Sequence, residues 1–190
     1  MNIGLYFGSF NPIHLGHLII ANHVASFTDM KQVWFIISPQ NPLKTSSELL
    51  NGYNRLHLVQ MAIEDNPKLK ASDIEFKLAK PSYTIDTLIH LSEKYPKHQF
   101  SVIMGSDSFS NLPKWKNYKA ILNNHSLIIY KRHGFEVDNS KLNGKITILD
   151  APLLELSASS IRKNIKEGKS IQYLVAEIVN KEIKDNGYYK

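Results

Sequence analysis

The sequence predicts an α/β fold in which a mostly parallel, doubly wound sheet carries helices on both of its faces. Short apolar runs such as Gln32–Ile37 and Phe100–Met104 are typical of strands that are buried on both faces. These runs alternate with longer segments of helical spacing, and such alternation is typical of parallel sheets. We therefore expect a Rossmann-like fold in a single domain, residues 1–190, that ends in a small helical part at about 157–190.

The expected elements follow one another in a regular order along the chain. Apolar or alternating runs predict strands at Asn2–Phe7, Gln32–Ile37, Ser72–Leu78, Phe100–Met104, Ser126–Tyr130 and Lys145–Leu149. Helical spacing predicts helices from Pro12 to Phe27 and at Asn51–Asp65, Thr84–Tyr95, Leu112–Asn124, Ser159–Glu167 and Gln172–Lys184. Ligands of parallel sheets bind beyond the carboxyl ends of the strands, so a site is expected among the loops 8–17, 38–44, 105–107 and 131–134.

The composition excludes several classes of protein. The chain has no cysteine, so disulfides and cysteine-based zinc sites are excluded. Its start lacks a signal-peptide pattern, and no apolar run approaches the roughly 20 residues that cross a bilayer. We therefore expect a soluble, cytoplasmic protein with no membrane partner. The net charge of +6 indicates an anionic partner, although a solvated basic surface explains it equally well.

The stretch 8–17 directly follows the first strand and has the features of a phosphate site. Asn11 suits the N-cap of the next helix, and Pro12 suits its first position, where the missing N–H costs nothing. The N-terminus of a helix offers unpaired N–H groups and a partial positive charge to a phosphate. His14 and His17, three residues apart on one helix face, add hydrogen-bond donors. Two plainer interpretations are surface polar residues and part of a metal site, and the second needs a third ligand that the neighbouring sequence does not offer.

Three residues in other loops are further candidates. Lys44 ends a loop expected beside the first one, although an exposed lysine is the plainer interpretation. Asp107 follows a buried strand, where a carboxylate either accepts a ribose hydroxyl or approaches a metal-bound phosphate, although a helix cap or turn residue is the plainer interpretation. Trp115 lies among polar residues and is either free to stack on an aromatic ligand or part of the core. The tripeptide Gly168-Lys169-Ser170 looks like the end of a phosphate loop, but Lys163 occupies the position of the loop's first glycine, so we exclude it.

Taken together, these motifs resemble those of the bacterial nicotinate-nucleotide adenylyltransferases, a branch of the nucleotidyltransferases with a His-x-Gly-His motif. The resemblance covers nearly the whole chain. The segments that carry it are Gly8-x-Phe10-Asn11-Pro12-x-His14-x-Gly16-His17, Ser38-Pro39 with Pro42-Leu43-Lys44, Ser82-Tyr83-Thr84-x-Asp86-Thr87-Leu88, Gly105-x-Asp107 with Trp115-Lys116, Leu156-Ser157-Ala158-Ser159-Ser160-Ile161-Arg162 and Ser170-Ile171-x-Tyr173-Leu174-Val175. The departures are Leu156 for isoleucine, Ala158 and Ser159 for serine and threonine, and Ala176 for proline.

The resemblance implies that the chain transfers the adenylyl group of ATP to nicotinate mononucleotide, giving nicotinate adenine dinucleotide and pyrophosphate in NAD biosynthesis. It implies catalytic roles for His14, His17, Lys44 and Arg162. It implies that ATP is bound by Gly8, Ser9, Phe10, His14, His17, Lys44, Gly105, Asp107, Ser157, Ser159, Ile161 and Arg162. It implies that nicotinate mononucleotide is bound by Asn11, Lys44, Tyr83, Thr84, Trp115 and Arg132. Mg²⁺ is expected to arrive with ATP, and no metal site built by the protein is expected.

The implied reaction requires few catalytic groups from the protein. A phosphate has a second pKa of about 6, so at neutral pH the attacking group is already largely a dianion. It needs no protein nucleophile and no strong general base. Positioning of the two anions and stabilisation of the leaving pyrophosphate are therefore expected to supply the rate.

Two other functions stay open. A related adenylyltransferase that acts on phosphopantetheine or nicotinamide mononucleotide would share the His17 site, but the segment 82–88 and Trp115 argue against it. A basic nucleic-acid-binding protein with the same fold would lose affinity steeply with salt and would not depend on ATP. The chain lacks dense Lys/Arg clusters with interleaved aromatics, so we expect no nucleic-acid partner. The sequence leaves the oligomeric state open, including a homo-oligomer.

Overall fold

The computed structural model describes residues 1–39, 49–138, 143–152 and 154–190. These residues form a six-stranded sheet with the order β3-β2-β1-β4-β5-β6, in which all neighbouring strands run parallel. The strands are β1 (Asn2–Gly8), β2 (Gln32–Ile37), β3 (Leu69–Ser72), β4 (Gln99–Gly105), β5 (Ser126–Tyr130) and β6 (Ile146–Leu149). The predicted parallel α/β sheet is therefore confirmed.

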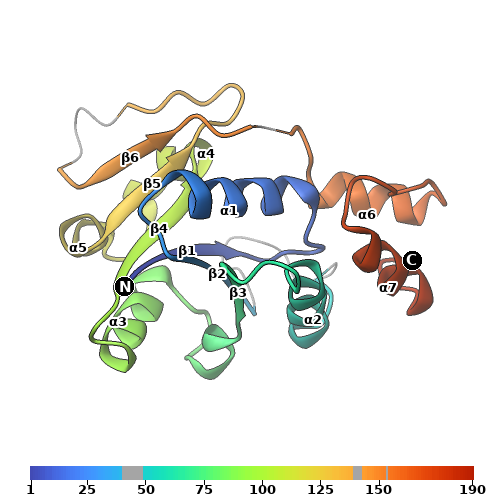
Figure 1. The fold of residues 1–190 in the computed structure, drawn as a ribbon, viewed down its shortest axis with the longest axis horizontal. Helices are drawn as coiled ribbons and strands as arrows, with labels where there is room; N and C mark the ends of the chain where they lie inside the picture. The colour runs from blue at the N-terminus through green and yellow to red at the C-terminus, as the bar shows by residue number, and fades with distance from the viewer. Residues whose placement is uncertain (40–48, 139–142, 153) are drawn as a thin grey trace.

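Helices connect the strands and cover the sheet (Figure 1). The α-helices are α1 (Leu15–Phe27), α2 (Gly52–Ala62), α3 (Thr84–Lys94), α4 (Ser106–Ser110), α5 (Tyr118–Asn124), α6 (Ala158–Lys166) and α7 (Glu177–Asp185). Two 3₁₀ turns are η1 (Ile74–Lys77) and η2 (Leu112–Lys114). In Figure 1 the last two helices lie together at one end of the molecule, beside the N-terminal end of α1.

The strands are buried on both faces because two hydrophobic clusters flank the sheet. One cluster contains buried residues of α1, α2, α6 and α7, and the other contains those of α3, α4 and α5. Successive residues of a strand point to opposite faces, so Leu5 packs into the second cluster and Tyr6 into the first. Burial of each large apolar side chain contributes about 1.5–3 kcal/mol, which explains why the continuous apolar runs fold as central strands.

Three predicted elements differ from the structure. The strand predicted at Ser72–Leu78 is wrong: β3 lies earlier, and the alternating residues form the 3₁₀ turn η1, which buries both Ile74 and Glu75. The helix predicted from Leu112 is split, since Pro113 belongs to the 3₁₀ turn η2 and Asn117 adopts a left-handed φ of 50° before α5. The last helix begins at Glu177 rather than Gln172, because Tyr173 has a φ of 63° that an α-helix does not tolerate.

The direction of the chain's crossovers reverses at β1. From β1 the chain passes through α1 to β2 on one side, and it later returns to β4 on the other side of β1. Ligands of doubly wound sheets bind at such a reversal, so the loops after β1, β2 and β4 meet at the expected site. No helix in the part of the chain that the structure describes is long and apolar enough to span a membrane.

Candidate active site

The turn after β1 is shaped by Gly8 and Phe10. Phe10 is buried and has a φ of 46°, a left-handed conformation that is uncommon for a residue with a side chain. Its ring folds back onto Gly8, where an added Cβ would lie only 2.8 Å from the Phe10 Cζ atom. Gly8 is therefore the residue that leaves room for this ring. The turn continues through Asn11, whose buried side-chain oxygen accepts a hydrogen bond from the main-chain N–H of Leu50 at 3.1 Å.

Helix α1 begins later than the sequence predicts. Its N-cap is His14, with an extended backbone (φ −144°, ψ 169°), and Leu15 is its first residue. The prediction that Asn11 is the N-cap and Pro12 the first helical residue is wrong. The side chain of Asn11 is committed to the loop before α2 instead, as its contact with Leu50 shows. The N–H of Leu15, the first helical residue, donates to the carbonyl of Leu174 at 3.0 Å, so this N–H is already used within the chain.

The two histidines of the motif form one unit. Their rings stack with centroids 3.7 Å apart and an interplanar angle of 25°. The main-chain N–H of His14 donates to Nδ1 of His17 at 3.3 Å, so Nδ1 acts as an acceptor and the proton of a neutral His17 ring resides on Nε2. The rings of Tyr6 and Phe10 contact His17 edge-on, at centroid distances of 6.0 and 5.1 Å. These contacts fix the orientation of the His17 ring.

His14 is almost completely buried and electrically neutral at ordinary pH. Burial lowers the pKa of its imidazole to about 4, with a smaller contribution from the positive charge of Arg132. Its Nδ1 atom has no hydrogen-bond partner among the described residues. A neutral ring stacked on His17 serves as a hydrogen-bonding group of fixed position, and it brings no positive charge of its own.

Helix α6 brings Arg162 to the same turn. Arg162 Nη1 donates to the main-chain carbonyl of Asn11 at 2.9 Å, across 151 positions of sequence. The helix is capped by Ser157, whose side chain accepts from the N–H of Ser160 at 3.1 Å, and it is anchored in the core by the fully buried Ile161. Ser159 is exposed on the same helix, with its Oγ 3.5 Å from Nη2 of Arg162. Helix α6 thus contacts the turn that precedes α1 through Arg162.

Asp107 and Arg132, which the resemblance implies bind different substrates, contact each other. Their side chains are 3.5 Å apart between Arg132 Nε and Asp107 Oδ1, and both are partly exposed. Asp107 also contacts the position where a Cβ on Gly105 would lie, so the glycine lets the carboxylate fold back over the end of β4. The main-chain N–H of Arg132 donates to the buried Ser106 at 2.8 Å. A partly exposed pair of this kind contributes at most about 1 kcal/mol, which leaves both side chains able to exchange partners for a ligand.

The predicted mononucleotide segments form a second group around α3. Thr84 is the first helical residue and Tyr83 the N-cap, so the prediction of Thr84 as N-cap is off by one position. Lys116 lies over the Tyr83 ring, with its Nζ 4.8 Å from the centroid, and forms an ion pair with Asp86 at 2.9 Å. Trp115 is partly buried and packs against the second hydrophobic cluster. The segments that contain Tyr83 and Trp115 are therefore joined by Lys116.

One predicted site residue lies outside the described residues. Lys44, which both substrate sites were expected to share, belongs to the segment 40–48, so its catalytic role stays a prediction.

Sequence reasoning missed Arg55, a fully buried cation of α2. Its guanidinium donates to four main-chain carbonyls: Leu50 at 2.8 Å, Ser9 at 2.5 Å, Ser38 at 2.8 Å and Pro39 at 3.1 Å. Burial lowers the pKa of Arg55 to about 10, so it remains charged at neutral pH. It ties the loop after β1 to the loop after β2. The only sequence signal was an arginine in a helix with apolar neighbours.

A second buried charged residue, Glu75 of η1, was also missed because its segment was predicted as a strand. Glu75 is 2% exposed and accepts hydrogen bonds from three hydroxyl groups. Neither Arg55 nor Glu75 belongs to a recognisable motif, since the partners of both come from distant positions.

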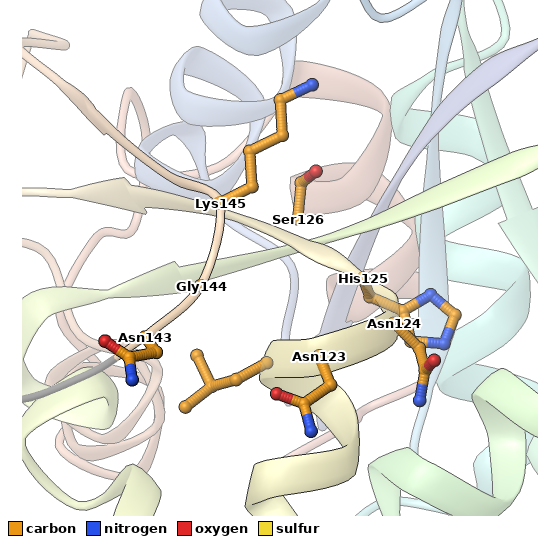
Figure 2. A pocket seen from close by; sticks show the side chains of 8 residues that line it. Asn123, Asn124, His125, Ser126, Asn143, Gly144 and Lys145 are labelled. Carbon is orange, nitrogen blue, oxygen red and sulfur yellow. The ribbon is translucent and has the colours of Figure 1, made fainter.

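The described surface hollows lie elsewhere. One is lined by the end of α5 and the starts of β5 and β6, where Figure 2 shows the amides of Asn123, Asn124 and Asn143, with Lys145 pointing away from them. This is the amino edge of the sheet, whereas His17 lies in the helix that follows the carboxyl end of β1. The described residues contain no group of three His, Cys, Asp or Glu side chains that could hold a metal ion.

The comparisons with known proteins agree with the geometry. A model of the cytidylyltransferase-like family matches residues 5–164. A probable nicotinate-nucleotide adenylyltransferase of Flavobacterium psychrophilum is 54% identical over 192 residues, covering all of both chains. One of Cytophaga hutchinsonii is 48% identical and covers all of this chain and 98% of its own.

Solved structures show the same fold. Plasmodium falciparum nicotinic acid mononucleotide adenylyltransferase complexed with NaAD superposes with a TM-score of 0.84 at 22% identity, covering 99% of this chain and 97% of its own. A putative nicotinate-nucleotide adenylyltransferase from Vibrio parahaemolyticus gives a TM-score of 0.73 at 22% identity, covering 99% of this chain and 94% of its own.

Proposed function

Because the chain belongs to the nicotinate-nucleotide adenylyltransferases of the cytidylyltransferase-like family, we propose that its described loops bind the two substrates of that enzyme and let them react in the following way. The enzyme transfers the adenylyl group of ATP to nicotinate mononucleotide and releases pyrophosphate, a step of NAD biosynthesis. A phosphate oxygen of the mononucleotide attacks the α-phosphorus of ATP, and the bond from that phosphorus to the β-phosphate oxygen breaks. The product is nicotinate adenine dinucleotide.

The observation that carries the proposed mechanism is the contact between Arg162 and the turn that precedes α1. Support comes from the bond of Arg162 Nη1 to the carbonyl of Asn11, which brings a guanidinium to the turn that precedes the stacked pair His14 and His17. Two kinds of group that suit an anion, imidazole and guanidinium, thus belong to the turn after β1 and its neighbour α6. This combination suits the triphosphate of ATP.

We assign His17 to the reacting phosphate. Its Nδ1 accepts from the N–H of His14, so the neutral ring carries its proton on Nε2, and we assign this N–H to a phosphate oxygen. A donor held in place before the reaction stabilises charge that grows on the phosphates without reorganising, and such groups contribute about 10²–10³-fold in rate. His14, neutral and buried, supports this ring and offers its own donor. Neither histidine has to take a proton, because the attacking phosphate is already largely a dianion.

The remaining predicted residues divide between two half-sites. For the ATP half we propose Gly8, Ser9, Phe10, Gly105, Asp107, Ser157, Ser159, Ile161 and Arg162, with Asp107 on the ribose. For the mononucleotide half we propose Asn11, Tyr83, Thr84, Trp115 and Arg132. Lys44 is proposed for both. We further propose that residues 1–190 work as one domain.

The carboxylate of nicotinate is the group that must be recognised. The N-terminus of α3 at Thr84 offers N–H groups to an anion, and Trp115 offers an aromatic face to the pyridinium ring. Support comes from Lys116, which holds the segments of Tyr83 and Trp115 together.

We propose that Mg²⁺ enters with ATP and is held mainly by its phosphates and by water. Mg²⁺ dehydrates reluctantly and commonly binds through substrate phosphates and one or two carboxylates. When bound, the ion would neutralise part of the phosphate charge.

A pyrophosphate-release assay with ATP and different co-substrates tests the function. We expect turnover with nicotinate mononucleotide, weaker turnover with nicotinamide mononucleotide, and none with phosphopantetheine. Equal efficiency with the amide would contradict the recognition of a carboxylate at α3, and no turnover with nicotinate mononucleotide would contradict the function itself.

A further inference from the structure

The carboxylate of Glu75 lies at a junction of three segments. It is 2% exposed, and its neighbours Ile74 and Phe76 pack against the two different hydrophobic clusters, so η1 is anchored on both sides. Oε2 accepts from Ser38 Oγ at 2.8 Å and from Ser82 Oγ at 2.7 Å. Oε1 accepts from Thr87 Oγ1 at 2.9 Å.

The three donors are neutral hydroxyl groups from parts of the chain that are far apart in sequence. Ser38 follows β2 directly, Ser82 precedes α3, and Thr87 lies in the first turns of α3. Ser82 and Thr87 are themselves buried. A buried carboxylate is costly unless its oxygens are hydrogen-bonded, so these three hydroxyls and Glu75 hold one another in place.

Glu75 thereby fixes the N-terminus of α3 relative to the carboxyl edge of the sheet. Between Ser82 and Thr87 lie the N-cap Tyr83 and the first helical residue Thr84. The segment is held from inside by Glu75 and from outside by Lys116, which pairs with Asp86 at 2.9 Å. The inner contact is buried and the outer one is exposed to solvent, so the inner contact sets the position more strongly.

Ser38 links this arrangement to the other half of the site. Its hydroxyl donates to Glu75, while its main-chain carbonyl accepts from Arg55 at 2.8 Å. Arg55 also donates to the carbonyl of Ser9 in the turn after β1. A continuous path of hydrogen bonds therefore runs from the turn after β1 to the start of α3.

We propose that Glu75 is a positioning residue for the mononucleotide half-site: it sets the α3 N-terminus at the place where the nicotinate group binds. This proposal rests on the proposed function, which assigns Tyr83 and Thr84 to nicotinate mononucleotide. Glu75 touches neither substrate and acts through Ser82 and Thr87. Its loss is expected to affect the mononucleotide and to leave ATP binding largely unchanged.

The test compares Glu75→Leu, Glu75→Gln and Ser82→Ala with the wild-type enzyme. Dissociation constants of nicotinate mononucleotide and of ATP are measured separately by titration calorimetry, together with KM, kcat and the melting temperature. For Glu75→Leu we expect the dissociation constant of the mononucleotide to rise about tenfold or more, while that of ATP changes by less than about twofold. Glu75→Gln keeps one oxygen that can accept from Ser38 and Ser82, so it should restore much of the affinity.

Ile183→Ala is the matched control. Ile183 is a buried residue of α7 in the other hydrophobic cluster, so its truncation destabilises the fold without moving α3. It should lower the melting temperature and leave both dissociation constants within about twofold of wild type. Equal losses for both substrates in Glu75→Leu, or no change for the mononucleotide, would overturn the proposal.

Ser82→Ala covers the case in which Glu75→Leu does not fold. It removes one of the three donors, and we expect a rise of about threefold for the mononucleotide. Unchanged affinity in this variant would overturn the proposal. If the wild-type enzyme turns over nicotinate mononucleotide and the variants bind it normally, the inference fails and the function stands. Absence of wild-type turnover would overturn both.

Discussion

The imidazole rings of His14 and His17 stack with their centroids 3.7 Å apart, and the main-chain N–H of the first donates to Nδ1 of the second. One histidine is therefore a support for the other. The ring of His17 thus has a fixed orientation at the start of α1, where His14 is the N-cap.

His17→Ala should reduce kcat by about 10²–10³-fold, because it removes a donor that is oriented before the reaction. The melting temperature should stay close to that of wild type. The control is His23→Ala, on the same helix but stacked on Phe27 away from the turn, which should leave kcat unchanged. Steady-state kinetics and thermal unfolding measure both effects. Nearly normal kcat in His17→Ala would contradict the proposed phosphate role.

The buried His14 should make stability depend on pH. Its pKa is about 4 in the folded protein against 6.5 in the unfolded chain, so between these values the unfolded state binds the additional proton. The free energy of unfolding should therefore rise as the pH increases from about 4 to 6.5, by on the order of 3 kcal/mol from this group, with no further gain above. Below pH 4 His14 is protonated in both the folded and the unfolded state, so the folded protein carries the full free-energy cost of burying the charged ring.

Urea unfolding across this range, compared between the wild-type enzyme and His14→Phe, isolates the contribution. Phenylalanine keeps a ring that can stack on His17 but cannot take a proton. Burial also lowers the pKa of His125, so more than one group contributes to the pH dependence of the wild-type free energy of unfolding. The difference between the two proteins therefore gives the contribution of His14. Identical slopes would show that His14 is readily protonated in the folded protein.

Gly8→Ala should destabilise the enzyme by about 1–3 kcal/mol and impair turnover, because its new methyl group would collide with the ring of Phe10. The collision predicts a specific interaction between the two positions. In a Phe10→Leu background, Gly8→Ala should cost clearly less than in the wild-type enzyme. A double-mutant cycle from urea unfolding measures the difference. Additive effects would mean that the ring is not the reason for the glycine.

Arg55→Leu should lower the free energy of unfolding by about 3 kcal/mol or more, since four buried carbonyls lose their donor. ATP binding should weaken as well, because the carbonyl of Ser9 belongs to the turn next to Phe10. Lys68→Leu is the control, since its ammonium donates to one carbonyl, that of Ala25 at 3.3 Å. Urea unfolding and ATP titration provide the two measurements. A loss no larger than that of the control would contradict the role of Arg55 as a tie between loops.

The sequence predicts the parallel sheet well because burial on both faces produces a direct signal. A short continuous apolar run such as Val33–Ile37 is typical of a strand buried on both faces, and all of its side chains are buried in the structure. The prediction fails at Ser72–Leu78 because alternating polar and apolar residues are typical of a half-buried strand. The segment instead forms a short 3₁₀ turn that buries two adjacent residues, Ile74 and Glu75.

The candidate site is predictable only where its chemistry is local. His14, His17 and Gly8 lie within ten residues, and their spacing on a strand, a turn and a helix indicates a phosphate site. Arg55 and Glu75 are buried charges whose partners come from several loops, so no spacing along the chain reveals them. The pairing of Asp107 with Arg132 likewise depends on the neighbouring positions of β4 and β5.

The bond between Arg162 and Asn11 also bears on when the enzyme first becomes competent during synthesis. The turn at Asn11 leaves the ribosome early, while α6 follows some 150 positions later, and contacts so distant in sequence form after local ones. A nascent chain that lacks α6 has the histidines but not the guanidinium, and it also lacks Ile161, the buried residue that docks this helix. Because α6 follows β6, the contact between Arg162 and the turn at Asn11 forms only after all six strands of the sheet have been synthesised.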